Sequence, residues 1–261
     1  MKTDRENWLA TLEHRRPQRI LYDSGFTPDL RRRLIEHIGT KDIGGYYGFW
    51  QAARLGPRRP DDIEPIDYTP YYEDEELPED VTFNPVGAAR IPADFYHFYR
   101  YVSPLRNATS LKELEEYPLP DYSDWDTSHY EETVRQARKE GKVVIGVVGH
   151  MYEWAWQIRG YQQFLMDMME RPEWCECLLD RLTELRRFQA VRAARAGADY
   201  LHCGDDVANQ ESLMFSKTML KDFILSRWES IWQEVKEMCR WKISMLCLRH
   251  VRSLGHLCKQ S

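Results

Sequence analysis

The chain has 261 residues, of which 42 are acidic and 36 basic, and its formal net charge of −6 argues against a nucleic-acid partner. No apolar run reaches the ~18 residues of a membrane span, and the charged start of the chain is no secretory signal. The length suits one large domain. Its cysteines are too sparse for a disulfide scaffold, so a reducing, cytoplasmic setting fits best.

The first elements read as a βα unit. Residues 4–14 predict an amphipathic helix, and 19–23 a short strand that ends in Asp23. A helix over 28–38 follows, with proline in its first turn and Gly39 at its end. Asp23 would then lie at the carboxyl end of the first strand, although a turn-forming acid is the structural alternative.

Residues 39–85 are the least regular part, and 62–68 are a candidate second barrel strand. Between 81 and 102, apolar and aromatic residues recur with breaks at glycine and proline. This pattern predicts an antiparallel hairpin beside the main sheet, whose aromatics could line a pocket or simply pack.

Two capping-box patterns, at 110–113 and 128–131, predict helix starts, the second helix ending at Lys139. Residues 142–149 form the clearest buried strand, β-branched on both faces as in a parallel strand covered by helices. Polar and aromatic side chains follow its carboxyl end: His150, Tyr152, Glu153, Trp154 and Trp156.

The second half continues the alternation. Helices are predicted at 161–170 and 173–196, a short strand at 199–203, and a helix over 216–236. Residues 242–248 are a last candidate strand. Strands that alternate with helices indicate an α/β protein with a largely parallel sheet.

Two carboxylates, Asp205 and Asp206, come directly after the strand at 199–203. Ligands and catalytic groups collect at the carboxyl ends of parallel strands, so these acids are candidate catalytic residues. The alternative is that either acid only caps the next turn. His150 is the best single acid–base candidate, although a histidine at a helix start can also be structural.

Several blocks together resemble the uroporphyrinogen decarboxylase (URO-D) superfamily over about residues 4–237. The blocks are Arg5–His14 with Pro17–Arg19, Tyr117–Asp121, Gly146–Gly149 leading to Trp156–Gly160, Gly197–Asp199, Gly204–Asp206 and Met214–Ser216. The resemblance implies a (β/α)8 TIM barrel with its site at the carboxyl ends of the strands.

The resemblance also implies one of two chemistries. Uroporphyrinogen decarboxylases remove carboxyl groups from the acetate arms of a tetrapyrrole without a cofactor. Related methyltransferases carry a methyl group from a corrinoid to a thiol held on zinc by His and Cys ligands. The arginine-rich loop expected after the first strand is replaced by residues 23–27, which places the chain closer to the methyltransferase-like branch.

The zinc motif expected on the fifth strand is replaced by Leu246–Arg249. Cys247, His250, His256 and Cys258 are spaced loosely like a metal site, but residues of an altered tail are the alternative. Cys175 and Cys177 are predicted to be structural. We therefore predict no metal and no cofactor for a decarboxylase, and a corrinoid with zinc for a methyltransferase.

Strands near residues 20, 65, 145, 201 and 244 would make about five of eight βα units, an incomplete, C-terminally truncated barrel. The prediction is one domain over 1–261 with an atypical tail at 238–261. An unclosed barrel exposes two sheet edges, which favours association with another copy of the chain.

The nominal activity is decarboxylation of uroporphyrinogen acetate arms in porphyrin biosynthesis, with inactivity through truncation left open. The alternatives are a corrinoid-dependent methyltransferase and a non-catalytic tetrapyrrole-binding fragment. The expected partner is a small molecule, a tetrapyrrole or corrinoid, with no nucleic acid and no membrane. The candidate catalytic residues are Asp205, Asp206 and His150, and the candidate substrate-binding residues are Asp23, Tyr152, Trp156 and Gln210.

Overall fold

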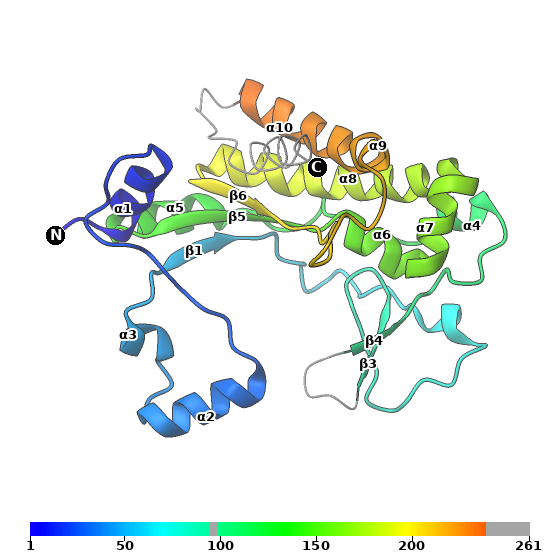
Figure 1. Ribbon diagram of the computed structural model, residues 1–261, viewed down its shortest axis with the longest axis horizontal. Coiled ribbons are helices and arrows are strands. Elements are labelled where there is room, and N and C mark those ends of the chain that lie inside the picture. Colours follow the sequence, from blue (N-terminus) through cyan, green and yellow to red (C-terminus); the bar gives the residue numbers. More distant parts are fainter. Residues whose placement is uncertain (94–98, 239–261) are drawn as a thin grey trace.

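The computed structural model describes residues 1–93 and 99–238, which form a mixed α/β fold with two three-stranded sheets (Figure 1). The strands are β1 (Ala52–Leu55), β2 (Thr82–Phe83), β3 (Ala89–Pro92), β4 (Tyr99–Val102), β5 (Val143–Gly149) and β6 (Tyr200–Cys203). The helices are α1 (Asp4–Leu12), α2 (Pro28–Ile38), α3 (Ile43–Tyr47), α4 (Leu111–Glu116), α5 (Tyr130–Lys139), α6 (Tyr152–Arg159), α7 (Tyr161–Glu170), α8 (Pro172–Ala196), α9 (Lys217–Met219) and α10 (Ser226–Met238).

The parallel sheet has the order β1-β5-β6 and carries the predicted buried strand at its centre. β5 pairs with β1 from Ala52 opposite Val143, and with β6 from Ile145 opposite Tyr200. Most of β5 is buried, which its β-branched composition predicts for a strand covered on both faces. The strands predicted at 142–149 and 199–203 are thus confirmed.

The predicted hairpin is also confirmed: β2, β3 and β4 form an antiparallel sheet separate from the parallel one. The hydroxyl of Tyr72, in a short 3-10 turn, donates to the carbonyl of Gly87 at 2.6 Å and accepts from the amide of Ala89 at 3.0 Å. This buried tyrosine ties the hairpin to the chain that precedes it.

The 25-residue helix α8 lies along the parallel sheet, and α10 packs beside it (Figure 1). Ser216 caps the start of α9, since its hydroxyl accepts from the amide of Met219 at 3.1 Å. The helix continues through a π-helical segment into α10, close to the predicted bounds. Five apolar side chains of this helical segment are buried: Phe223, Ile224, Trp228, Ile231 and Val235.

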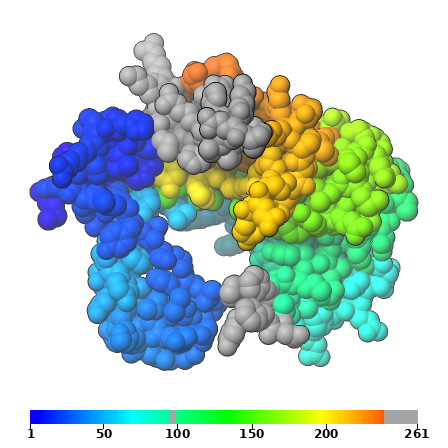
Figure 2. All heavy atoms as spheres, in the orientation of Figure 1, coloured from blue at the N-terminus to red at the C-terminus, as the bar shows by residue number. Residues whose placement is uncertain are grey.

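The strand predicted at 19–23 is wrong, and β1 at 52–55 is the first strand that forms. Residues 19–50 belong to a lobe with α2 and α3 that projects away from the sheet (Figure 2). Ile20 is 80% exposed, and α2 has no buried residue. A short apolar run becomes a strand only where another strand offers its backbone groups, and β5 offers them to β1 instead.

Two further predictions fail locally. Residues 62–68 form no strand. The helix expected from Ser128 begins at Tyr130, without a side-chain cap, because the Asp126 carboxylate takes the amide of Ser128 at 2.8 Å in a local turn. The other capping box, at Ser110 and Glu113, is confirmed.

Closure into a barrel is not seen within residues 1–93 and 99–238, where β1 and β6 are the outer strands of the parallel sheet. Of the five strands counted from the sequence, those near 145 and 201 are confirmed and those near 20 and 65 are wrong. The candidate strand 242–248, the altered zinc motif at 246–249 and the tail cysteines and histidines lie outside the described residues.

Replacing Asp199 with alanine should lower the free energy of unfolding by about 2–4 kcal/mol. Its buried carboxylate accepts from Arg5, with Nη2 to Oδ1 at 2.8 Å, and from the amide of Val144 at 2.9 Å. Alanine would leave both donors unpaired. Urea unfolding would measure the loss, and Glu13→Ala, which removes an exposed ion pair with Arg15, should cost less than about 1 kcal/mol. Equal losses in the two variants would contradict the prediction.

Candidate functional site

The carboxyl ends of β5 and β6 bring three ionisable side chains together. His150 follows β5 directly, Glu153 lies in the first turn of α6, and Asp205 comes two residues after β6. One potential ligand atom from each lies within 4.8 Å of the others. Because β5 and β6 are parallel neighbours, their ends meet at one edge of the sheet, as the sequence predicts for His150 and Asp205.

Asp205 holds the surrounding elements together. Its Oδ1 accepts from the amides of Met151 at 2.8 Å and Glu153 at 3.3 Å, so it caps α6 from the neighbouring strand. Its Oδ2 accepts from the indole of Trp228 in α10 at 3.0 Å. Burial raises the pKa of the Asp205 carboxyl to about 6, against the lowering effect of these hydrogen bonds. Asp205 therefore acts in part as a cap that accepts backbone N–H groups, the structural alternative to a catalytic role, although it caps α6 rather than the turn that follows it.

His150 and Glu153 form the accessible part of the cluster. Nδ1 of His150 lies 2.5 Å from Oε2 of Glu153, and the two side chains are 46% and 19% exposed. The Glu153 carboxylate raises the pKa of the imidazole, and burial opposes this shift. A substrate approaching the strand ends can therefore contact the imidazole directly.

A buried arginine hydrogen-bonds the backbone of His150. Arg186 of α8 is 1% exposed, and its Nε donates to the carbonyl of His150 at 2.8 Å. Its Nη1 donates to Oε1 of Gln189 at 2.8 Å, and its guanidinium carbon lies 3.8 Å from the ring centre of Trp154. Burial lowers the pKa of Arg186. The arginine thus fixes the turn between β5 and α6.

Neither Arg186 nor Trp228 is a site candidate from the sequence, and Glu153 is found there only among the side chains that follow the strand at 142–149. Arg186 has a signal in the sequence, since it stands four residues after Leu182 and seven after Leu179, within the apolar stripe of its helix. A charged residue in that register is buried with partners or with a function. Trp228 has no such signal, because nothing local distinguishes it from an ordinary core tryptophan.

The other predicted residues have varied positions. Asp206 and Gln210 are exposed on the loop after β6. Tyr152 is fully buried beside Phe215, with ring centres 5.2 Å apart, and its hydroxyl has no hydrogen-bond partner within the described chain. Trp156 is partly buried, with its ring centre 5.7 Å from that of Tyr101.

Asp23 is not brought to the cluster. It is exposed on the projecting lobe. Burial raises the pKa of Tyr200, the first residue of β6, and the charge of Asp23 adds a smaller increase. Asp23 therefore lies near the start of β6, whereas Asp205 follows its end. The expectation that Asp23 ends a strand is wrong, and its role in substrate binding stays a prediction.

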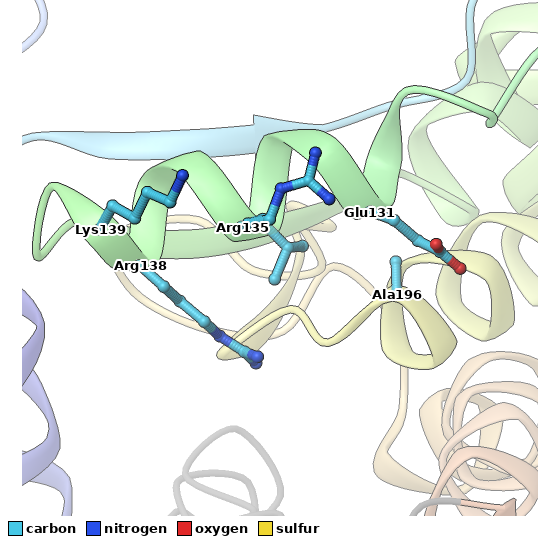
Figure 3. A pocket seen from close by; sticks show the side chains of 6 residues that line it. Glu131, Arg135, Arg138, Lys139 and Ala196 are labelled. Carbon is cyan, nitrogen blue, oxygen red and sulfur yellow. The ribbon is translucent and has the colours of Figure 1, made fainter.

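A separate surface hollow of about 490 Å³ lies between α5 and the end of α8 (Figure 3). Arg135, Arg138 and Lys139 project from α5, and Ala196 comes from α8. Residue 196 precedes β6 and residue 139 precedes β5, so the hollow lies by the amino ends of these strands. It is therefore distinct from the cluster at their carboxyl ends.

The metal-binding chemistry of the described residues is that of His, Glu and Asp. Burial raises the pKa of the thiols of Cys175 and Cys177 on α8, and the Cys175 thiol lies 3.5 Å from the carbonyl of Phe164. These contacts suit a structural role rather than thiolate ligands. Cys175 and Cys177 are therefore poor candidates for zinc ligands, whereas the cluster of His150, Glu153 and Asp205 offers donors for a divalent cation.

Three comparisons place the chain among known proteins. The model of the uroporphyrinogen decarboxylase (URO-D) family matches residues 100–261. Three chains of solved structures match; one, a methyltransferase from Methanosarcina mazei, is 16% identical with a TM-score of 0.54, and the match covers 90% of this chain and 68% of that one. No curated protein matches. The helices within residues 1–93 and 99–238 include no candidate membrane span.

Proposed function

Because the chain belongs to the uroporphyrinogen decarboxylase family, on its methyltransferase-like side, we propose that it transfers a methyl group from a corrinoid to a small thiol. The observation that carries the proposal is the convergence of His150, Glu153 and Asp205 at the carboxyl ends of β5 and β6. A thiol becomes a good nucleophile only as a thiolate, so this reaction needs a group that removes its proton.

In the proposed reaction the thiol lies against the exposed face of His150, and the cluster removes its proton. Oε2 of Glu153 lies beside Nδ1 of the imidazole, and Arg186 fixes the backbone from which His150 projects. A bound methylcorrinoid would supply the methyl group and would keep the electron pair of its cobalt–carbon bond. The new carbon–sulfur bond takes its electron pair from the thiolate.

Replacing His150 with glutamine should lower the rate of methyl transfer by at least ~100-fold, since a positioned proton-transfer group contributes about that much. The assay mixes the protein with methylcobalamin and 2-mercaptoethanol and follows the corrinoid spectrum and the methylated thiol by mass spectrometry. His37→Gln, on the exposed surface of α2, is the matched control. A His150 variant as fast as the wild-type chain would refute the assigned role.

Decarboxylation of uroporphyrinogen is the second candidate, because the matching family model carries that description and Asp206 places an accessible carboxyl beside Asp205. This candidate would release carbon dioxide and shorten the acetate arms of the tetrapyrrole, which mass spectrometry detects. Binding of a corrinoid or porphyrin without turnover in either assay would instead support the non-catalytic alternative.

A further inference from the structure

We propose that His150, Glu153 and Asp205 bind a divalent first-row cation. This inference rests on the proposed location of the functional site and names the agent that activates the acceptor there. It differs from the thiolate–imidazole zinc site implied by the sequence resemblance, because its donors are one nitrogen and two carboxylate oxygens. Such a set suits Mn²⁺, Fe²⁺ or Zn²⁺ better than a soft ion such as Cu(I).

The geometry supplies the first argument. The three ligand atoms lie within 4.8 Å of one another and come from two separate strand ends. Nδ1 of His150 and Oε2 of Glu153 are 2.5 Å apart, yet within the described part of the chain Nδ1 makes no hydrogen bond with acceptable geometry. Metal–ligand bonds of roughly 2.0–2.2 Å place neighbouring ligand atoms about 3 Å apart. The pair would therefore open by less than about 1 Å to receive an ion.

The supporting contacts hold the ligands in place. Asp205 is fixed by the amides of Met151 and Glu153 and by the indole of Trp228. Each Asp205 oxygen can still accept another contact, since a carboxylate offers about four lone-pair positions. Arg186 holds the carbonyl of His150. Hydrogen bonds to the ligand residues are what orient metal ligands in proteins.

The charge balance supplies an independent argument. Across residues 1–93 and 99–238, neither Glu153 nor Asp205 forms an ion pair with a lysine or an arginine. Arg186 is near enough for its charge to interact with that of Asp205, but its guanidinium donates to His150 and Gln189 rather than to that carboxylate. A histidine that binds a metal is neutral, and the two carboxylates then face a single fixed cation, Arg186, which leaves one negative charge in excess. A divalent ion would compensate this excess negative charge.

Three protein ligands leave coordination positions open for water or a substrate atom, as in catalytic rather than structural metal sites. A thiol bound at an open position would lose its S–H proton to solvent and remain on the ion as a thiolate. The cluster would thereby achieve the deprotonation that the proposed reaction needs, with no change in the oxidation state of the ion.

The test is a titration of the full chain with Mn²⁺ after treatment with a chelator, followed by isothermal calorimetry in the absence of substrate. Mn²⁺ avoids the cysteines elsewhere in the chain, because it prefers oxygen and nitrogen donors to thiolates. We expect one site per chain, weakened at least ~10-fold in Glu153→Gln and unchanged in Glu211→Gln, an exposed glutamate of the loop after β6.

Asp205→Asn tests the second carboxylate, and its thermal unfolding shows whether the variant is folded. If Asp205→Asn does not fold, Glu153→Gln still decides the question. Among the hydrogen bonds of the described residues, Glu153 makes none to α10, so its replacement leaves the contacts of that helix intact. Absence of saturable Mn²⁺ binding, or equal affinity in Glu153→Gln, would overturn the inference. Methyl transfer by metal-free protein would overturn the metal site's role but leave the proposed function. Saturable Mn²⁺ binding without methyl transfer would support the metal site and count against the proposed function.

Discussion

Replacing Asp167 with alanine should lower the free energy of unfolding by about 3–5 kcal/mol, because it leaves the guanidinium of Arg159 buried without its carboxylate. Nε of Arg159 and Oδ2 of Asp167 are 2.7 Å apart, and the side chains are only 3% and 5% exposed. Nη1 of Arg159 also donates to the carbonyl of Leu105 at 2.6 Å. The pair joins the end of α6 to α7 and to the loop after the hairpin.

Urea unfolding followed by circular dichroism would measure this loss. The double variant Arg159→Met/Asp167→Leu should recover most of it, since neither charge is then left buried. Glu36→Ala, which removes an exposed ion pair with Arg32, should change the free energy by less than about 1 kcal/mol. A loss below about 1 kcal/mol in Asp167→Ala would show that Arg159 finds another partner or reaches solvent.

The sequence predicts best those elements whose burial follows from their own composition. The strand at 142–149 is mostly β-branched, and the helices at 161–170 and 173–196 have clear boundaries, so both kinds of element form where expected. The run at 19–23 has the same local appearance but lies on the projecting lobe, while the less apolar Ala52–Leu55 pairs with β5. Strand formation there depends on a partner far along the chain, which no local pattern reports.

The candidate site divides in the same way. His150 and Asp205 are found from the sequence because each stands within two residues of the carboxyl end of a predicted strand. Glu153 joins them only because α6 begins at Tyr152 and turns its first residues toward Asp205, a consequence of the bonds from Met151 and Glu153 to that carboxylate. Asp23 has the same sequence pattern as Asp205 and lies elsewhere because its strand does not form. Parallel strand ends predict a site only when the strands are neighbours.

Replacing Gly149 with alanine should destabilise the protein by about 2–4 kcal/mol and weaken both methyl transfer and Mn²⁺ binding. Gly149 has φ +84°, a left-handed conformation that costs an alanine about 1–2 kcal/mol. An added Cβ would also lie 2.9 Å from Nη1 of Arg186. The guanidinium would have to move, and its bond to the carbonyl of His150 would be strained.

Gly39→Ala separates these two causes. Gly39 ends α2 with φ +74°, and no atom lies within 4 Å of an added Cβ, so its variant bears the backbone cost alone. The free energies of unfolding of the two variants, measured in urea, should therefore differ by about 1–2 kcal/mol, the part that comes from the Arg186 contact. Only Gly149→Ala should change the affinity for Mn²⁺, because only that turn positions His150. If Gly149→Ala and Gly39→Ala lost the same stability and kept the same affinity for Mn²⁺, Arg186 would have to shift without displacing the imidazole of His150.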